Sequence, residues 1–204
     1  MKVLLINGSP RKAGNTHLAL SEVANELEKA GIEAEIMQLG THPVRSCIVC
    51  NTCKNKADNR CTFDDDLCNR VSEKMRECDA LIVGSPVYYG QPNGGVLALI
   101  QRALYSAGSY FTGKPAAGVA VCRRGGGTAA LQTLLMPFQI LNMPIVTSQY
   151  WNIVYGRDAG EATLDAEGMQ TMRSLARNMA ALLKATEGQP KPEYEARQAM
   201  NFIR

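Results

Sequence analysis

Residues 3–16 read Val3-Leu4-Leu5-Ile6-Asn7-Gly8-Ser9-Pro10-Arg11-Lys12-Ala13-Gly14-Asn15-Thr16, and this stretch decides the fold. It starts as a short apolar run and turns at a segment rich in glycine and hydroxyl groups. Leu18, Val23 and Leu27 then recur at the spacing of one helix face, and a second apolar run follows at Ala34–Leu39. A strand, a helix and a second strand in this order predict a βαβ unit with two parallel strands.

The same alternation continues along the chain. Three more short apolar runs, each bounded by turn residues, predict buried strands at Ala80–Val83, Ala117–Val121 and Pro144–Val146. Helical patterns are found at about Asp65–Glu77, Gly95–Ala107, Thr128–Leu141 and Asp165–Lys184. The sequence therefore predicts an α/β fold of the flavodoxin-like type: a doubly wound five-stranded parallel sheet in the order 2-1-3-4-5 with helices on both faces. We expect one domain over residues 1–186 and a C-terminal arm over residues 187–204, where Gln189-Pro190-Lys191-Pro192 is unlike a sheet segment.

The composition of the chain indicates which partners and which cellular compartment to expect. The 204 residues carry a net charge of +3 from 22 basic and 19 acidic side chains, without a dense basic run, so nucleic acid is not expected as a partner. The first apolar run is too short for a signal peptide or a membrane span, and no membrane partner is expected. Seven cysteines, an odd number and partly clustered, suit a reducing compartment, which predicts a cytoplasmic protein.

The loop after the first strand has the composition of a phosphate site. Ser9 and Thr16 supply hydroxyl groups, Asn15 or Thr16 can cap the following helix, and Arg11 adds a cation. The loop lacks the Gly-Lys-Ser/Thr ending of a Walker motif and the Gly-x-Gly-x-x-Gly spacing of a dinucleotide site. A terminal monophosphate such as that of FMN fits best, and an ordinary capped turn is the alternative.

The loop after the third predicted strand, Gly84–Gly95, should face the same sheet edge. Pro86 and Gly90 can hold the backbone open so that its polar groups meet the rim of a flat ring, and Tyr88 or Tyr89 can cover its face. A plain packing role for these residues is the alternative.

The loop after the fourth predicted strand, Cys122–Thr128, is basic and rich in glycine. Arg123 could stabilise negative charge on a reduced flavin, Gly126 lies in the same flavin-facing turn, and Arg124 could meet a nucleotide phosphate. Two solvated arginines are the alternative.

The first two loops together resemble the NADPH-dependent FMN reductase and iron-sulfur flavoprotein group of the flavodoxin-like superfamily. The resemblance rests on Gly8-Ser9-Pro10-Arg11-x-x-Gly14-Asn15-Thr16 and on Gly84-Ser85-Pro86-Val87-Tyr88. It implies FMN as the cofactor, flavin contacts by Pro86, Val87, Tyr88 and Tyr89, and a homodimer. The arm and the segment around Trp151 offer surfaces for such a dimer.

A compact cysteine motif lies between the second strand and the next helix. Cys47, Cys50, Cys53 and Cys61 are separated by two, two and seven residues, which suits an iron-sulfur cluster better than zinc. Iron-sulfur flavoproteins carry such a motif at this place, whereas many related reductases keep similar cysteines without an established cluster. A [4Fe-4S] cluster and a set of reduced thiols both stay open.

The sequence contains no arrangement typical of a hydrolase, and a flavin enzyme needs few catalytic side chains because the cofactor performs the redox chemistry. We expect an FMN-dependent oxidoreductase that takes hydride from NADH or NADPH and reduces a small-molecule acceptor such as a quinone, a flavin, or a nitro or azo compound. One alternative is an iron-sulfur flavoprotein that relays electrons between protein partners. Another is a flavin-free nucleotide-binding or regulatory module.

Overall fold

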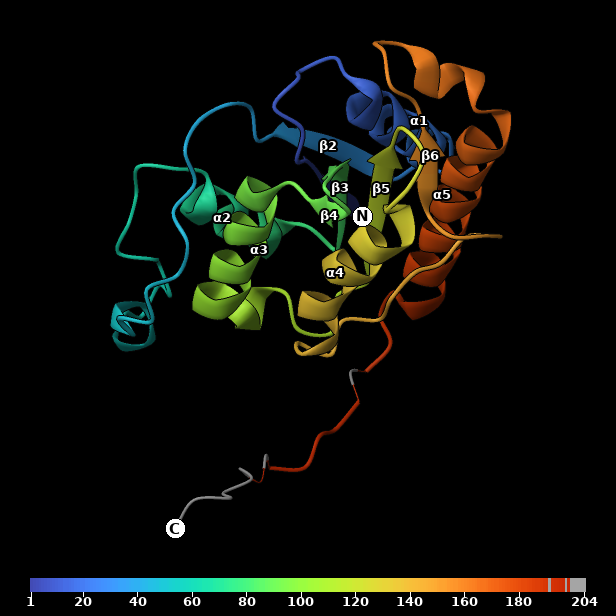
Figure 1. Cartoon of the computed structure of the whole chain (residues 1–204). Helices are drawn as coiled ribbons and strands as arrows, with labels where there is room; N and C mark the ends of the chain where they lie inside the picture. Colours follow the sequence, from blue (N-terminus) through green and yellow to red (C-terminus); the bar gives the residue numbers. More distant parts are fainter. Residues whose placement is uncertain (191, 197, 199–204) are drawn as a thin grey trace.

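The computed structural model describes residues 1–190, 192–196 and 198. A parallel sheet forms its centre, with the strand order β2-β1-β3-β5-β6 (Figure 1). Its strands are β1 (Lys2–Asn7), β2 (Glu33–Gln38), β3 (Ala80–Tyr88), β5 (Ala116–Cys122) and β6 (Ile153–Tyr155). The short β4 (Gln91–Pro92) pairs antiparallel with the end of β3. The predicted doubly wound fold and its strand order are confirmed.

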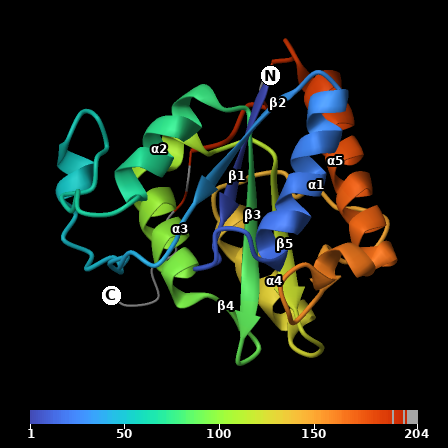
Figure 2. The same ribbon diagram turned by 90° about the horizontal axis from the view of Figure 1, so that it is seen from above.

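Helices cover both faces of the sheet (Figure 2). One face carries α1 (Asn15–Lys29) and α5 (Ala166–Thr186), and the other carries α2 (Cys68–Glu77), α3 (Gly94–Ala107) and α4 (Gly127–Gln139). Short 3-10 turns lie at Thr52–Asn55, Gly108–Tyr110 and Glu161–Leu164.

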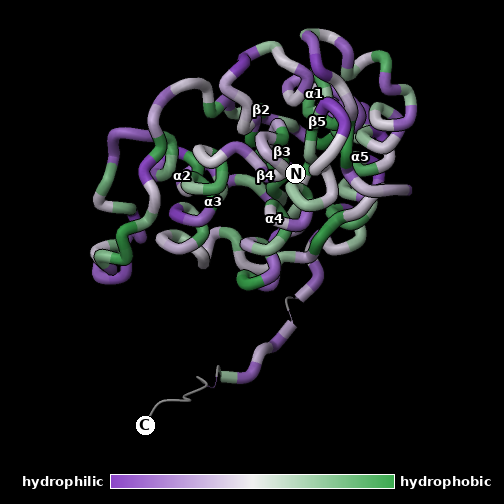
Figure 3. Tube along the Cα trace, viewed as in Figure 1, coloured by the Kyte–Doolittle hydropathy of each residue, from purple (hydrophilic) through white to green (hydrophobic). Residues whose placement is uncertain are grey.

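The side chains of β1 show why its apolar run is continuous. Val3 and Leu5 pack into the core under α1 and α5, whereas Leu4 and Ile6 pack into the core under α2, α3 and α4. Successive side chains of a strand point to opposite faces, so a strand covered on both faces needs apolar residues at every position. Figure 3 shows the hydrophobic residues concentrated in this centre and the hydrophilic ones in the outer loops.

The last strand differs from the prediction. Within the predicted run Pro144–Val146, Ile145 forms only an isolated bridge with Ala116, and the ladder with β5 is formed instead by Ile153–Tyr155. The chain turns between these two pairings, and the Ser148 hydroxyl donates to the carbonyl of Tyr150 over 2.6 Å. The turn interrupts the edge strand, so the apolar run that follows it becomes the fifth parallel strand.

The third strand is longer than predicted. Gly84–Tyr88 was expected to be loop, but it continues β3 and pairs with β5 up to Pro86 and with β4 beyond it. The Ser85 hydroxyl stabilises the return of the chain, because it accepts from the backbone N–H of Asn93 over 2.9 Å.

Residues 187–190, 192–196 and 198 lie outside helices and strands, and the rest of the predicted arm falls outside the described residues. The division into a domain and an arm stays a prediction. In the part of the chain that the structure describes, no helix is long and apolar enough to cross a membrane.

Candidate functional site

The loops that follow β1, β3 and β5 meet at the carboxyl edge of the sheet, beside the point where the strand order reverses. The Gly8 N–H donates to the carbonyl of Gly84 over 2.8 Å, which joins the first loop to β3. A Cβ built on Gly126 would lie 2.7 Å from the Cα of Gly90, so the loop after β5 touches the β3–β4 turn. Open α/β sheets bind their ligands at this place. The structure therefore brings the three predicted flavin loops together.

The first loop ends on the N-terminus of α1. Gly14 is the N-cap residue, and within the described residues no side chain caps this helix end. The expectation that Asn15 or Thr16 caps the helix is therefore wrong, because both already belong to its first turn. The first turn carries no acidic residue, Arg11 and Lys12 are exposed beside it, and Thr16 is buried. An uncapped helix end with neighbouring cations favours an anion.

Side chains from two strands fix the shape of this loop. The Asn7 Oδ1 accepts from the Ser9 N–H over 3.1 Å, and the Asn7 Nδ2 donates to the Gln38 Oε1 over 2.6 Å. Gln38 in turn donates to the Ser9 carbonyl over 2.5 Å, and the Ser9 hydroxyl accepts from the Arg11 N–H over 3.1 Å. Asn7 and Gln38 were not among the predicted site residues. Their signal was a polar residue at the carboxyl end of each of two adjacent strands.

Asn15 lies in the first turn of α1 and faces the segment after β6. Its Nδ2 donates to the Asp158 carbonyl over 2.9 Å, and its Oδ1 accepts from the Ala162 N–H over 3.2 Å. Asn15 thereby ties this segment to the loop after β1. Its predicted contact with a cofactor stays a prediction.

The β3–β4 hairpin forms the second part of the site. Pro86, Val87 and Tyr88 belong to β3, and Tyr89 and Gly90 form the turn with φ values of 50° and 78°. Two central residues with positive φ are typical of a type I′ hairpin turn, which Gly at the second position favours. Both tyrosines are exposed, and the exposed fraction of Tyr89 reaches 107%. Their rings are therefore available to a ligand at this edge.

The loop after β5 forms the third part. Arg123 and Arg124 are exposed, and Gly126 has a φ of 86°, which L side chains rarely adopt. On its α5 side lies a cavity of about 290 Å³, whose walls include Arg124, Tyr155 and the neighbouring rings of Tyr150 and Trp151. These two rings have their centroids 5.0 Å apart. Burial raises the pKa of the Tyr155 hydroxyl.

The predicted cysteines gather at a different place, in the long segment between β2 and α2. Cys47, Cys50, Cys53 and Cys61 all line one small pocket against α3. All four are free thiols, and hydrogen bonds from the hydroxyl and backbone N–H of Thr52 lower the pKa of Cys50. Among the described residues, no group of three or more His, Cys, Asp or Glu side chains has the arrangement of a metal site. The donors suit an iron-sulfur cluster in kind and number, although their sulfur atoms do not converge in metal-binding geometry.

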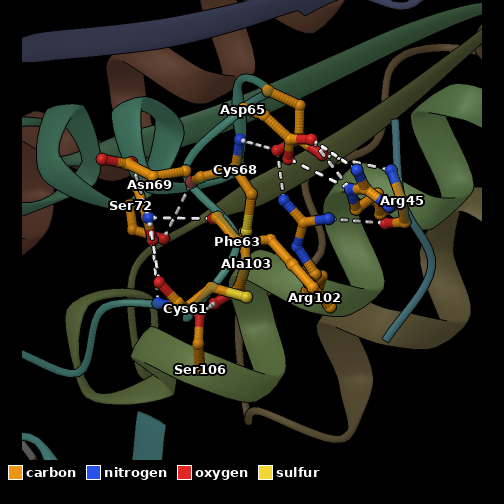
Figure 4. A network of polar contacts seen from close by, with 12 residues as sticks. Arg45, Cys61, Phe63, Asp65, Cys68, Asn69, Ser72, Arg102, Ala103 and Ser106 are labelled. Atoms are coloured by element: carbon orange, nitrogen blue, oxygen red, sulfur yellow. Dashed lines mark hydrogen bonds and ion pairs between the residues drawn. The ribbon is translucent and has the colours of Figure 1, made fainter. Parts of the chain in front are cut away.

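The remaining cysteines lie apart from this pocket lining. Cys68, Cys78 and Cys122 are buried, and burial raises the pKa of Cys68 to about 11. Asn69, in the first turn of α2, holds the end of the cysteine segment (Figure 4). Its side chain accepts from the Cys61 N–H over 2.8 Å and donates to the carbonyls of Cys61 and Phe63.

Comparisons with known proteins agree with this architecture. A family model described as NADPH-dependent FMN reductase matches residues 1–158. An iron-sulfur flavoprotein of Methanocaldococcus jannaschii is 34% identical, with the match covering 90% of this chain and 98% of the relative. An iron-sulfur flavoprotein of Archaeoglobus fulgidus is 33% identical over 92% of this chain and 98% of its own length.

Solved structures show the same fold. FerB of Paracoccus denitrificans, a flavoenzyme NAD(P)H:(acceptor) oxidoreductase, has a TM-score of 0.66 at 17% identity, covering 90% of this chain and 97% of FerB. The family match and the two relatives together establish the family. The chain belongs to the NADPH-dependent FMN reductase family of flavodoxin-like oxidoreductases, in the group of the iron-sulfur flavoproteins.

Proposed function

We propose that this chain is an FMN-dependent oxidoreductase that takes hydride from NADH or NADPH and passes the electrons to a small-molecule acceptor such as a quinone, a flavin, or a nitro or azo compound. The observation that carries the proposal is the uncapped N-terminus of α1, in contact through the sheet edge with the β3–β4 hairpin and the Gly126 loop. FMN needs both an anion site and a surface for a flat ring. This edge offers the two together.

In this proposal, one loop binds the phosphate of FMN and the other two contact its ring. Ser9, Arg11, Asn15 and Thr16 would hold the phosphate, where a helix N-terminus and an exposed guanidinium favour negative charge. The ring would lie against the hairpin and the loop after β5, which contribute Pro86, Val87, Tyr88, Tyr89, Gly90, Arg123 and Gly126.

FMN, when bound, supplies the hydride and single-electron chemistry. The exposed guanidinium of Arg123 provides positive charge for a reduced ring, and the exposed Tyr89 ring can cover a ring face. The cavity walled by Tyr150 and Trp151 offers aromatic surface next to Gly126 for a planar acceptor.

Two measurements test this function. Saturating FMN should raise the melting temperature, and the FMN-loaded protein should be bleached by NADH or NADPH and recover its colour when a quinone is added. A protein that shows no thermal shift with FMN would contradict the flavin site. If neither nucleotide bleaches the flavin bands, NADH and NADPH are not the hydride donors, but the proposal that the protein binds FMN is unaffected.

A second candidate function is a relay of single electrons between protein partners through FMN and an iron-sulfur cluster. It is favoured by the pocket that Cys47, Cys50, Cys53 and Cys61 line together. Four thiolates are the donor set of a [4Fe-4S] cluster, which would supply one-electron chemistry. Stoichiometric iron and sulfide in anaerobically purified protein would support this candidate, and flavin bands without iron would support the reductase alone.

We also propose a homodimer. The exposed Tyr150 and Trp151, with exposed fractions of 59% and 55%, form an aromatic surface of the kind enriched at interfaces. Light scattering should give twice the mass of the 22.1 kDa chain. A monomer at all concentrations would overturn this proposal.

A further inference from the structure

The cavity of about 290 Å³ beside the loop after β5 is bounded by three separate segments of the chain. Arg124 lines it from that loop, Tyr150 and Trp151 line it from the turn before β6, and Glu167 lines it from the first turn of α5. Pockets that bury a whole drug-sized ligand measure about 300–1,000 Å³. The cavity therefore suits a group of mononucleotide size better than a whole dinucleotide.

Two aromatic rings form one wall of this cavity. The centroids of Tyr150 and Trp151 lie 5.0 Å apart, their planes are tilted by 47°, and both side chains are exposed. Exposed rings of this kind offer apolar faces on which a flat ligand ring can stack. The wall therefore favours a ligand that contains a planar ring system.

The cavity also carries opposite charges that the protein does not neutralise. Arg124 and Glu167 are exposed, and among the described residues no hydrogen bond or ion pair engages the guanidinium of the first or the carboxylate of the second. The other carboxylate of the lining, Asp165, is already engaged, because it accepts from the N–H of Gly168 over 2.9 Å and from the N–H of Tyr155 over 2.7 Å. Arg124 is thus available to an anion, and Glu167 is available to a hydrogen-bond donor.

We propose that this cavity binds an adenine nucleotide and holds the adenosine phosphate half of the NADH or NADPH that donates the hydride. The inference rests on the proposed function. An adenine nucleotide has a flat ring for Tyr150 and Trp151, a phosphate for Arg124 and an exocyclic amino group that donates to Glu167. Gly126 also lines the cavity, so the bound nucleotide lies beside the loop that the proposed function places against the flavin ring.

A planar acceptor such as a quinone would use the two rings without needing Glu167. Both ligands can use the wall in turn, because the acceptor enters after the oxidised nucleotide has left. The amino group separates the two kinds of ligand. IMP has the phosphate and nearly the ring shape of AMP, but it carries a carbonyl oxygen in place of the amino group. This oxygen would face a carboxylate, so IMP should bind more weakly than AMP.

The experiment is a titration of the full chain with AMP, with and without saturating FMN, followed by the fluorescence of Trp151, which is the only tryptophan of the chain. Adenine stacked on this ring should quench its emission, and saturating AMP should raise the melting temperature. We expect Arg124→Met to weaken AMP binding about tenfold. Arg123→Met is the matched control, because it removes the same charge from an exposed neighbour that does not line the cavity, and it should weaken binding about twofold at most.

The role of Glu167 is tested by comparing AMP with IMP. Wild-type protein should bind IMP about tenfold more weakly than AMP. Glu167→Gln should narrow this difference, because a glutamine amide can donate to the carbonyl oxygen of IMP. Since Arg124 and Glu167 are both exposed, neither substitution removes a core contact.

The outcomes that would overturn the inference are distinct. They are the absence of both quenching and a thermal shift with AMP, equal affinities for AMP and IMP, and equal losses in the variants of Arg124 and Arg123. Emission of Trp151 that changes with protein concentration and not with AMP would assign the rings to an interface between two copies, and would also overturn it.

The proposed function fails in a different way. Protein that binds AMP but not FMN would overturn the flavin site and leave the nucleotide site supported. Protein whose bound FMN is bleached by NADPH, but whose Trp151 does not respond to AMP, would overturn the nucleotide site alone.

Discussion

The phosphate loop, residues 8–16, and the cysteine segment, residues 40–67, are built in opposite ways. The loop is short, and its backbone is bonded to β3 and to side chains at the ends of β1 and β2. The cysteine segment is long, mostly exposed, and contains only the 3-10 turn Thr52–Asn55 as regular structure. Val49, Asn51 and Asn59 all have positive φ values there.

The difference shows what positions each set of functional groups. The sheet places the phosphate loop, because the loop leaves one strand and enters one helix within a few residues. A few anchors hold the cysteine segment, chiefly Asp66 on Arg102 and Asn69 on the Cys61 turn. The sheet therefore fixes the first loop, whereas no arrangement of the cysteine side chains typical of a metal site is present among the described residues.

The largest effect is expected from a substitution that breaks the main anchor of the cysteine segment. Asp66→Ala leaves the buried Arg102 charge without its partner and should lower the free energy of unfolding by about 3–5 kcal/mol. Asp65→Ala, which removes an exposed pair, should cost at most about 1 kcal/mol. Urea unfolding measures both, and equal losses would show that burial does not decide the strength of these pairs. FMN affinity should stay unchanged at temperatures where Asp66→Ala is folded, because the two regions are held separately.

A smaller effect is expected where two flavin loops touch. Gly126→Ala places a Cβ 2.7 Å from the Cα of Gly90 at a φ of 86° and should cost about 1–3 kcal/mol in stability, with at least a tenfold loss of FMN affinity. Gly125→Ala is the control, because a Cβ there meets nothing within 4 Å. Fluorescence titration with FMN compares the two. Equal affinities would mean that the contact between these loops does not shape the ring site.

Removing one hydroxyl from the phosphate loop should act on binding more than on folding. Ser9→Ala and Thr16→Ala should each weaken FMN binding by about tenfold, because each removes a donor to the phosphate, whereas the melting temperature without FMN should change little. The measurement is an FMN titration beside a thermal melt of the FMN-free protein. If neither variant loses affinity, the phosphate assignment of this loop fails.

The smallest effect concerns Glu35 within the outer strand β2 and serves as a reference for both regions. Hydrogen bonds from Lys74 and Lys2 lower the pKa of Glu35 below its ordinary value of 4.5. A carboxylate with a lowered pKa stabilises the fold above its unfolded pKa, and this contribution is lost as the pH falls below about 4.5 through the folded pKa.

Glu35→Gln should therefore cost about 0.5 kcal/mol at pH 7 and progressively less in acid. Urea unfolding of wild type and variant over a pH series checks this. A stability difference that persists at pH 3 would indicate that the side chain acts through packing. A change in FMN affinity would show that the ion pairs of Glu35 also act on the loop after β1.

Much of the fold could be predicted because it rests on local periodicity. The spacing of apolar residues predicts buried strands and amphipathic helices. Because crossover connections between parallel strands are right-handed, few topologies then remain possible. The last strand was misplaced because Pro144–Val146 and Ile153–Tyr155 are both short apolar runs. Only the turn at Ser148 and the pairing with β5 decide which of them forms the ladder.

The candidate site divides in the same way. Gly8, Ser9 and Thr16 could be found from the sequence because glycine and hydroxyl residues that directly follow a strand and precede a helix are typical of an anion-binding loop. Asn7 and Gln38 carried only the signal of a polar residue at a strand end, and their hydrogen bond to each other joins positions distant in the sequence. Arg102 carried no such signal, because its partners Asp66 and Arg45 are also distant. Arg102 in particular resembles any helical arginine until α3 is packed against the cysteine segment.

By itself, the sequence determined the doubly wound fold, the loop of glycine and hydroxyl residues at the start of α1 and the spacing of the four cysteines. These features depend on residue type and spacing over short distances. The tertiary structure alone decided that the loops after β1, β3 and β5 touch, that Asn15 holds the segment after β6, and that the buried guanidinium of Arg102 pairs with Asp66. Such contacts join residues far apart along the chain, and their free energy exists only once the sheet and its helices have packed.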